Sequence, residues 1–503
     1  MPIFYEVATK ARICIILSAA ALLAAVLAPL LFAPALSDEI FTLEAASRPW
    51  PDLWACLQAD VHPPLHYLLV KAWFALTGPG LVSLRTFSLL MAVAAVCVAG
   101  WLIPSSPALS PWSAWFFAAN GILLMMSVYG RMYALLALLC LLAWLSSDRW
   151  LRSTRPGWAV LAGSAVAAGL CTHHFFGLFL VGLAAWSVIV HQRAAVRLAI
   201  PWTAGTAVWA AIWGRTAWDQ LTNRTAHLAW VPPTDFASWA LIATSHLVFV
   251  LAALPIALVA LGWSRRPAAP SWPREARAAA AAALLTLALP GILSLWRPLL
   301  NARFTIIAAP FLAVALAPLG RWTSGVLPGA AFAVASIWLW WPHTGAECNS
   351  REAARMLAAR ASAHDTVLFC RLTRKPIEYH WPAPAPQRRS FPAEIDAHPG
   401  YEGRQTPQQL QAEARELLAS PARRVFVVAD TESPSCQILL QLLQAAGWRQ
   451  RETLLACPGV RNHYFNRLLL FEPPLTRAES PSAAPPGPKS PPPGPDVGAY
   501  GRP

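Results

Sequence analysis

Long apolar segments separated by short polar ones fill the first two thirds of the chain. An apolar helix of about 17 to 25 residues spans the roughly 30 Å hydrocarbon core of a bilayer. The apolar windows, and the residues that interrupt them, predict about eleven transmembrane helices. These are expected near residues 13–36, 84–103, 111–128, 131–147, 157–172, 174–190, 198–213, 238–262, 278–296, 301–319 and 323–341. The pattern predicts an α-helical polytopic membrane protein and excludes a soluble enzyme.

The pattern changes at residue 344, where short amphipathic and alternating segments replace the long apolar ones. They predict helices at 351–363 and 434–447 and strands at 366–371, 424–429, 452–456 and 468–471. We therefore expect a transmembrane domain over 1–343 and an α/β domain over 344–474. The remaining residues, 475–503, are rich in Pro, Gly and Ser and are expected to be disordered.

The distribution of charged residues predicts how the chain is oriented in the membrane. Only 13% of the residues are charged and 56% are hydrophobic, and the formal net charge is +14. If the N-terminus is cytoplasmic, the basic residues gather in the cytoplasmic loops, as the positive-inside rule requires. The outer face then receives the loops 37–83, 214–237 and 297–300 and the α/β domain. The positive charge thus indicates orientation rather than a nucleic-acid partner.

The first outer loop, 37–83, begins with Asp38 and Glu39. Ser37 and Asp38 are good N-cap residues for a following helix, so a structural role accounts for this pair when it is taken alone. The functional interpretation is a general base or a metal ligand at the membrane surface, which needs support from other residues.

Further along the same loop, Asp60 and His62 precede two prolines. Pro63 holds His62 out of helical geometry, and a new helix can begin at Leu65. Asp60 and His62 therefore lie on a stiff segment at a helix entrance, where they can meet a ligand at the bilayer surface. A purely structural bend is the alternative.

Arginines open two later spans from the same face. Arg131 lies between Tyr129 and Tyr133, and Arg303 follows Asn301. Ionisable residues at membrane depth are usually paired or functional, and a guanidinium can donate two hydrogen bonds to neighbouring phosphate oxygens. Both arginines are therefore candidate phosphate ligands, and a salt bridge from Arg131 to Asp38 or Asp60 is the structural alternative.

Two adjacent histidines, His173 and His174, lie at another outer junction. Neighbouring helical residues face different directions, so the pair alone makes a poor metal site. The carboxylates, histidines and arginines all lie on the same face of the predicted helix bundle. This asymmetry is the main functional signal in the sequence.

The motifs, taken together and in order, resemble the GT-C glycosyltransferases, in the bacterial branch related to protein O-mannosyltransferases and aminoarabinose transferases. The resemblance covers residues 10–345. It is carried by Asp38-Glu39, Asp60-x-His62-Pro63-Pro64-Leu65, Arg131-Met132-Tyr133-Ala134-Leu135, Thr172-His173-His174-Phe175-Phe176-Gly177 and Asn301-Ala302-Arg303-Phe304.

The resemblance implies an inverting transferase of the bacterial inner membrane that uses a polyprenyl-phosphate-linked sugar. The implied acceptor is a hydroxyl, and the sequence leaves open whether it belongs to lipid A, another lipid, a glycan or a protein. Asp38 would act as base, with Asp60 as the other candidate, and Arg131 and Arg303 would hold the carrier phosphate. Substrate contacts are expected from Glu39, His62, Tyr129, Tyr133, His173 and His174.

Two positions depart from the family pattern. Many relatives have an acidic residue where this chain has Tyr129, and an aromatic one where it has His174. The first change argues against a charge pair there, whereas the second leaves open a histidine-rich site that binds a divalent metal. The candidate metal ligands are Asp38, Glu39 and His174.

Two other functions compete with transfer. A transporter or flippase of a lipid-linked or anionic solute would show polar sites near the bilayer midplane, whereas the midspan residues here are almost wholly apolar. A noncatalytic scaffold would lack a cavity joining Asp38 to Arg131 and Arg303.

Overall fold

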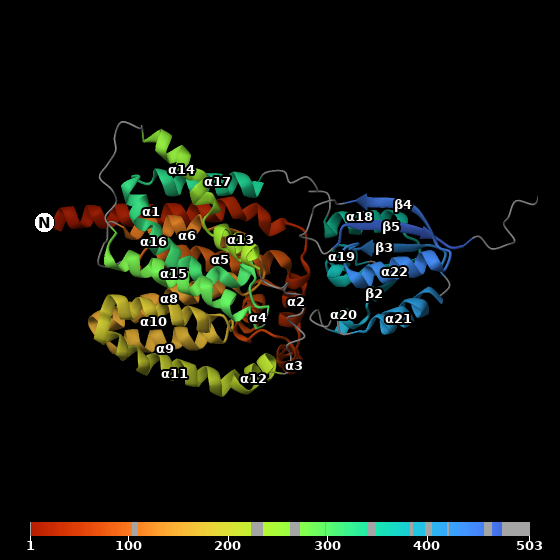
Figure 1. Ribbon diagram of the computed structural model, residues 1–503, viewed down its shortest axis with the longest axis horizontal. Coiled ribbons are helices and arrows are strands. Elements are labelled where there is room, and N and C mark those ends of the chain that lie inside the picture. Colours follow the sequence, from red (N-terminus) through yellow and green to blue (C-terminus); the bar gives the residue numbers. More distant parts are fainter. Residues whose placement is uncertain are drawn as a thin grey trace, which may run out of the picture.

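The computed structural model describes residues 2–102, 109–222, 235–261, 272–296, 298–340, 349–382, 386–397, 405–419, 422–456 and 465–474. It has a helical body followed by a smaller domain built on a sheet (Figure 1). The tail 475–503, for which disorder was predicted, lies outside the described residues.

The helices of the body begin and end as follows. They are α1 (Pro2–Leu27), η1 (Ala28–Phe32), α2 (Ser37–Ser47), α3 (Trp50–Ala59), α4 (Leu65–Thr77), α5 (Leu81–Ala99), α6 (Ser110–Ala118), α7 (Gly121–Met126), α8 (Tyr133–Ser153), α9 (Pro156–Leu170), α10 (Phe176–His191), η2 (Gln192–Leu198), α11 (Ala199–Trp209), η3 (Ala210–Gly214), α12 (Arg215–Thr222), α13 (Phe236–Ser245), α14 (Val248–Ala260), α15 (Arg274–Leu293), η5 (Ala302–Ala308), α16 (Ala309–Trp322) and α17 (Val326–Trp340).

All eleven predicted spans fall on helical segments, but fewer are long and apolar enough to cross a membrane. Within the described residues six stretches satisfy both conditions, or seven if α13 and α14, which are bent by 55°, form one span. The apolar helices α4, α9 and α17 are shorter. One of the six stretches, Phe176–Gln220, covers two predicted spans. The described residues thus form a multi-pass helical body with six or seven candidate spans by these criteria, and the predicted count of eleven is not confirmed.

The central helix of the body is α8. Most of its length is buried, and Trp144 packs against Trp186 of α10 and Phe311 of α16, with ring centroids 5.0 and 4.7 Å apart. The apolar faces of α1, α5, α6, α15 and α16 complete one continuous core. This packing holds the N-terminal end of α8, where Arg131 lies, at a fixed place in the body.

The loop 37–83 is itself helical, with α2, α3 and α4 between the first two long helices. Ser37 and Asp38 were expected to cap a helix, but α2 already begins at Ser37, so both lie in its first turn. The capping group is instead Glu39, whose carboxylate accepts the N–H of Leu36 at 3.2 Å. Asp38 is therefore available for other contacts.

The smaller domain has a five-stranded sheet in the order β2-β1-β3-β5-β4. Its strands are β1 (Thr366–Cys370), β2 (Gln387–Phe391), β3 (Val425–Ala429), β4 (Arg449–Ala456) and β5 (Arg467–Glu472). Strands β2, β1 and β3 are parallel, whereas β5 runs antiparallel to β3 and β4. Its helices are α18 (Ser350–Arg360), η6 (Arg371–Thr373), α19 (Arg374–His380), α20 (Glu394–Ala397), α21 (Pro407–Ala419) and α22 (Pro434–Ala445).

Side chains alternate between the two faces of this sheet. Val367 and Phe369 pack with α18 and α19 on one face, whereas Leu368 and Cys370 pack with α21 and α22 on the other. The sheet is therefore the middle layer of an α/β sandwich. The sequence prediction had no counterpart for strand β2 or for the helices α19, α20 and α21.

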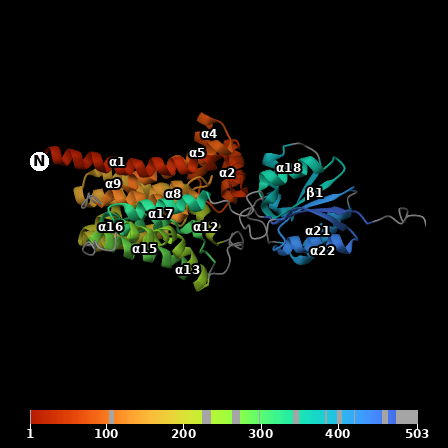
Figure 2. The ribbon, with the colours of Figure 1, turned by 90° about the horizontal axis from the view of Figure 1, so that it is seen from above.

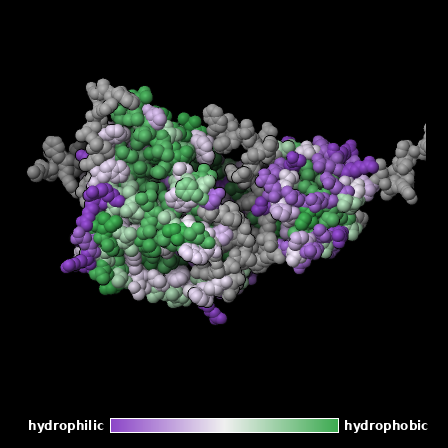
Figure 3. Space-filling view, viewed as in Figure 1, coloured by the Kyte–Doolittle hydropathy of each residue, from purple (hydrophilic) through white to green (hydrophobic). Residues whose placement is uncertain are grey.

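The sheet domain docks on the end of the helical body that carries α2 (Figures 1 and 2). The N–H of Ala35 donates to His380 Nε2 at 3.1 Å, and Ser350 donates its hydroxyl to the Ala35 carbonyl at 2.8 Å. Lys375 pairs with Glu44 of α2 at 3.0 Å. Hydrophobic residues dominate the visible surface of the body, while hydrophilic ones cover much of the sheet domain (Figure 3). The end of the body that carries α2 and the sheet domain thus lie next to each other.

Candidate active site

Asp38 lies in the first turn of α2, next to residues from two distant parts of the chain. Tyr129 donates its hydroxyl to Asp38 Oδ2 at 2.6 Å, and Arg303 Nη1 donates to the same oxygen at 2.7 Å. Arg303 is positioned by Asn301, whose side-chain oxygen accepts the Arg303 N–H at 3.2 Å. Asp38 and Arg303 side chains are each 20% exposed, so this ion pair remains reachable by a ligand.

The charges around Asp38 set its protonation. Burial alone would raise the pKa of the Asp38 carboxyl, but Arg303, Arg131 and the Tyr129 hydroxyl together lower it to about 2. Asp38 is therefore ionised at neutral pH and is a weak base as long as Arg303 is bound to it.

Arg131 lies beside Asp38 just before α8 and is 4% exposed. Its Nη1 donates to Thr42 Oγ1 and to the Tyr67 hydroxyl, both at 3.1 Å, and more distantly to the Asp38 carbonyl at 3.4 Å. Its Nε is buried without a hydrogen-bond partner. Within the described residues Arg131 forms no salt bridge with Asp38 or Asp60, so its charge is balanced only through space and part of its donor capacity is unused.

Asp60 forms a second carboxylate centre on the other side of Arg131. Its Oδ2 accepts the Tyr67 hydroxyl at 3.0 Å and lies 3.2 Å from His62 Nδ1, which donates to it. His62 Nδ1 is also 3.4 Å from Arg131 Nη2. Gln220 donates to the Asp60 carbonyl at 2.7 Å. Asp60 is 4% exposed, and is thus less open than Asp38 to an incoming hydroxyl.

The two histidines of the motif have different surroundings. His174 Nε2 lies 3.2 Å from the Gln220 side-chain oxygen, and burial lowers its pKa to about 4. His173 packs its ring near His62, Tyr133 and Phe304, at centroid distances of 5.8, 6.1 and 5.3 Å. The structure therefore places His173 among the candidate site residues and His174 in the support of the Asp60 segment.

The ring of Tyr133 packs against both Tyr129 and His173. It stacks on Tyr129, with ring centroids 6.2 Å apart and planes only 7° from parallel, and it is 1% exposed. The stack holds the Tyr129 hydroxyl in position against Asp38.

Glu39 lies apart from this group. Its carboxylate binds Arg85 of α5 at 2.6 and 2.8 Å and accepts the Gly130 N–H at 3.0 Å. Arg85 in turn donates to the carbonyls of Ala33 and Pro34. Both side chains are buried, so the pair fixes the chain that enters α2 and the turn that carries Arg131. In this geometry the Glu39 carboxylate positions the backbone, and the substrate contact and metal ligation expected of it stay predictions.

Sequence reasoning did not single out Arg85, Thr42, Tyr67 or Gln220. The signal for Arg85 was present, because an arginine inside an apolar span needs a partner. Tyr67 stands at the end of the Asp60 motif, but nothing in the sequence indicates that its hydroxyl bridges Asp60 and Arg131.

The candidate metal ligands are not gathered. Asp38 binds Arg303, Glu39 binds Arg85, and His174 meets Gln220. Across the described part of the chain, no group of three or more His, Cys, Asp or Glu side chains is arranged to hold a metal ion.

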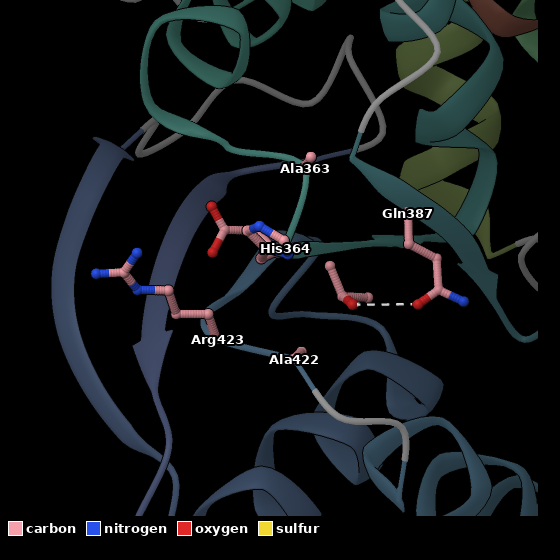
Figure 4. A pocket seen from close by; sticks show the side chains of 7 residues that line it. Ala363, His364, Gln387, Ala422 and Arg423 are labelled. Atoms are coloured by element: carbon pink, nitrogen blue, oxygen red, sulfur yellow. Dashed lines mark hydrogen bonds between the residues drawn. The ribbon is translucent and has the colours of Figure 1, made fainter.

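A separate pocket of about 350 Å³ lies in the sheet domain, lined in part by His364, Gln387 and Arg423 (Figure 4). The carboxylate in its wall, Asp365, is bound by Arg424 at 2.7 Å and by the Ser362 N–H at 2.7 Å. The polar groups of this pocket thus hold loop ends together, and none of them belongs to the cluster around Asp38.

No protein-family model matches the chain, and no curated protein matches it. Two solved structures of ArnT from Cupriavidus metallidurans are similar to it. One, bound to undecaprenyl phosphate, has a TM-score of 0.47 and 11% identity, covering 81% of this chain and 87% of that chain. The other, in the apo state, has a TM-score of 0.46 with the same identity and coverage.

Proposed function

We propose that this protein is an integral-membrane glycosyltransferase that moves a sugar from a polyprenyl-phosphate carrier to a hydroxyl acceptor at the outer face of the membrane. The observation that carries the proposal is the contact of Asp38 with Arg303, at 2.7 Å, next to the incompletely paired Arg131. A carboxylate and two guanidinium groups at one end of a helical body are the groups this reaction needs.

The arginines form the phosphate side of the proposed site. As the bond between the sugar and the phosphate breaks, the carrier phosphate gains negative charge. Fixed donors and positive charges aimed at that phosphate stabilise the transition state more than the bound substrate. Arg131 has a free N–H, and Arg303 can exchange its carboxylate partner for a phosphate oxygen.

Asp38 is the proposed base. Binding of the phosphate to Arg303 weakens its ion pair with Asp38, and the pKa of the Asp38 carboxyl then rises from about 2. The acceptor oxygen forms a bond to the anomeric carbon while its proton passes to Asp38. The bond from that carbon to the phosphate oxygen breaks, and the carrier phosphate leaves with the electron pair. Attack opposite the phosphate inverts the anomeric centre.

Asp60 is proposed to orient the acceptor rather than to take its proton, since its Oδ2 already accepts from Tyr67 and His62. It is the alternative base. Substrate contacts by Tyr129, Tyr133, His62 and His173 belong to the same proposal.

The proposed location is the bacterial cytoplasmic membrane, with α2 and the sheet domain on the outer side. The positive charges of the opposite loops support this orientation. The full set of eleven crossings would require the shorter apolar helices, such as α9 and α17, to cross as well.

The test compares envelope lipids and glycans from cells with and without the gene by mass spectrometry. The expected result is the loss of one hexose, pentose or uronic acid from a lipid, glycan or protein. Restoration by the wild-type gene but not by Asp38→Asn supports the proposed chemistry. An unchanged envelope, together with solute counterflow in vesicles containing only this protein, would establish the transporter instead.

A further inference from the structure

His173 has one ring nitrogen engaged and one without a partner. Its Nδ1 accepts the N–H of Phe175 at 3.1 Å. Its Nε2 is buried and has no hydrogen-bond partner, and the whole residue is 4% exposed. Both facts concern a side chain inside the candidate site.

The contact with Phe175 fixes the tautomer. A neutral imidazole has one donor nitrogen and one acceptor nitrogen. Because Nδ1 accepts an N–H, the ring proton is on Nε2. Burial, followed by the neighbouring His62 and His174 and then by Arg131 and Arg303, holds the pKa of His173 well below its ordinary range, so the ring stays neutral. The unpartnered atom is therefore an N–H donor.

A buried N–H that lacks an acceptor costs free energy. Such a group in a site indicates that a ligand supplies the acceptor. Arg131 Nε is a second buried N–H without a partner in the same site. The His62 side chain connects the two residues, because its ring centroid is 5.8 Å from that of His173 and its Nδ1 is 3.4 Å from Arg131 Nη2.

The missing acceptor has a recognisable chemistry. Arg131 and Arg303 carry permanent positive charge near the ring and are among the groups that lower the pKa of His173, and such charges attract an anion. The two unpartnered groups are both donors, which suits a group that only accepts. A sugar hydroxyl fits less well, because it is itself a hydrogen-bond donor and the two unpartnered groups need acceptors.

We propose that His173 donates a hydrogen bond from Nε2 to an unesterified oxygen of the phosphate group bound by Arg131 and Arg303. This rests on the proposed function, because that function makes the phosphate part of a lipid carrier. His173 is then a binding residue for the donor substrate, and its contribution comes from a neutral donor rather than from charge.

Two variants separate this role from packing. In His173→Asn the side-chain oxygen can replace Nδ1 as acceptor of the Phe175 N–H, but no donor reaches the Nε2 position. In His173→Gln the longer amide places an N–H near that position. We expect His173→Asn to weaken binding of undecaprenyl phosphate to the purified full-length protein in detergent by about 10- to 100-fold, and His173→Gln to weaken it by less than about 10-fold. Equal binding by wild type and His173→Asn would overturn the proposal.

A measurement on the wild type covers the case in which a variant does not fold. In protein labelled with ¹⁵N-histidine, the resonance of the His173 Nε2–H should shift on addition of undecaprenyl phosphate and stay in place with undecaprenol, which has no phosphate. A resonance that does not move while undecaprenyl phosphate binds would overturn the proposal and leave the proposed function intact. A shift without any sugar transfer would overturn the proposed function and leave the role of His173 intact.

Inorganic phosphate distinguishes the two sources of this group. The same shift at a much lower concentration of undecaprenyl phosphate than of inorganic phosphate assigns a lipid phosphate. Saturation by inorganic phosphate at equal or lower concentration would overturn the assignment to a lipid.

Discussion

Replacing Asp38 by asparagine tests the centre of the proposed site. Asparagine has nearly the same shape, and its side-chain oxygen can still accept the Tyr129 hydroxyl. What it removes is the negative charge that binds Arg303 at 2.7 Å and the ability to take a proton. The change is therefore expected to affect catalysis far more than folding.

The stability cost follows from the pKa of Asp38. The pKa is about 2 in the folded protein against an ordinary 3.8, and each unit corresponds to about 1.4 kcal/mol, so the ionised carboxylate contributes about 2 kcal/mol at neutral pH. Because the folded pKa is lowered, this contribution is fully present above about pH 4 and is lost as the pH falls through about 2. Asp38→Asn should thus be less stable than wild type by a constant amount from pH 5 to 8, and the difference should shrink below pH 4.

Two assays follow the change. Thermal unfolding of both proteins in detergent, across this pH range, measures the stability difference. Restoration of the missing envelope product in cells lacking the gene measures transfer, which should fall by about 10²- to 10⁴-fold, the usual contribution of a general base. The double variant with Arg303→Gln should be less impaired than the sum of the two single changes, because the pair acts together.

Full product formation by Asp38→Asn would refute the role of Asp38 as base and move it to Asp60. A stability difference that persists unchanged at pH 2 would show that the lowered pKa does not describe the folded protein.

Three further predictions follow from other contacts. Arg131→Gln should weaken binding of undecaprenyl phosphate by about 10- to 100-fold, measured with the purified protein, because a charge-assisted hydrogen bond is lost; unchanged affinity would exclude Arg131 as a phosphate ligand. Glu39→Gln should lower the unfolding free energy by about 3 to 5 kcal/mol, because Arg85 is left buried without its carboxylate; thermal unfolding at neutral pH checks this, and a change below about 1 kcal/mol would contradict the buried pair. Burial, followed by nearby positive charge, lowers the pKa of His380 to about 4, so its contribution to stability is present above about pH 6.5 and falls as the pH drops toward 4. His380→Gln should remove this part of the pH dependence of unfolding while preserving an acceptor for Ala35, and an unchanged pH profile would speak against it.

The apolar pattern located the helices well but did not reveal their internal breaks. The predicted span 111–128 is divided into α6 and α7, because Asn120 ends one helix and caps the next by accepting the Leu123 N–H at 3.1 Å. A single polar residue barely changes the mean hydropathy of a strongly apolar window, so the hydropathy pattern does not reveal the break. The bend of 55° between α13 and α14 was missed for the same reason.

In the sheet domain, the missed strand was the one with the least apolar sequence. β2 reads Gln-Arg-Arg-Ser-Phe and lies at the edge of the sheet, where its first residues remain largely accessible. An edge strand buries less side-chain surface than a central one, so its sequence carries a weaker alternating signal. The buried central strands β1 and β3 were predicted within one residue of their observed ends.

For the candidate site, the sequence indicated which residues share one face, but not their contacts. Asp38 and Arg303 are 265 residues apart, and only the packed helices determine that they meet. Packing also decides the role of Glu39. Although Glu39 is next to Asp38 in sequence, its carboxylate binds Arg85 and not the groups around Asp38. Adjacent residues on a helix point in different directions, which divides the acidic pair into one site carboxylate and one structural carboxylate.

The docking of the sheet domain has a practical consequence for dissecting the protein. Its residues Ser350 and His380 hold the backbone of Ala35 from both its N–H and its carbonyl, three residues before Asp38. A truncation that ends the chain before the sheet domain would therefore also release the segment that leads into α2. Loss of transfer in such a truncated protein could therefore result from a displaced Asp38 and would not by itself assign a function to the sheet domain.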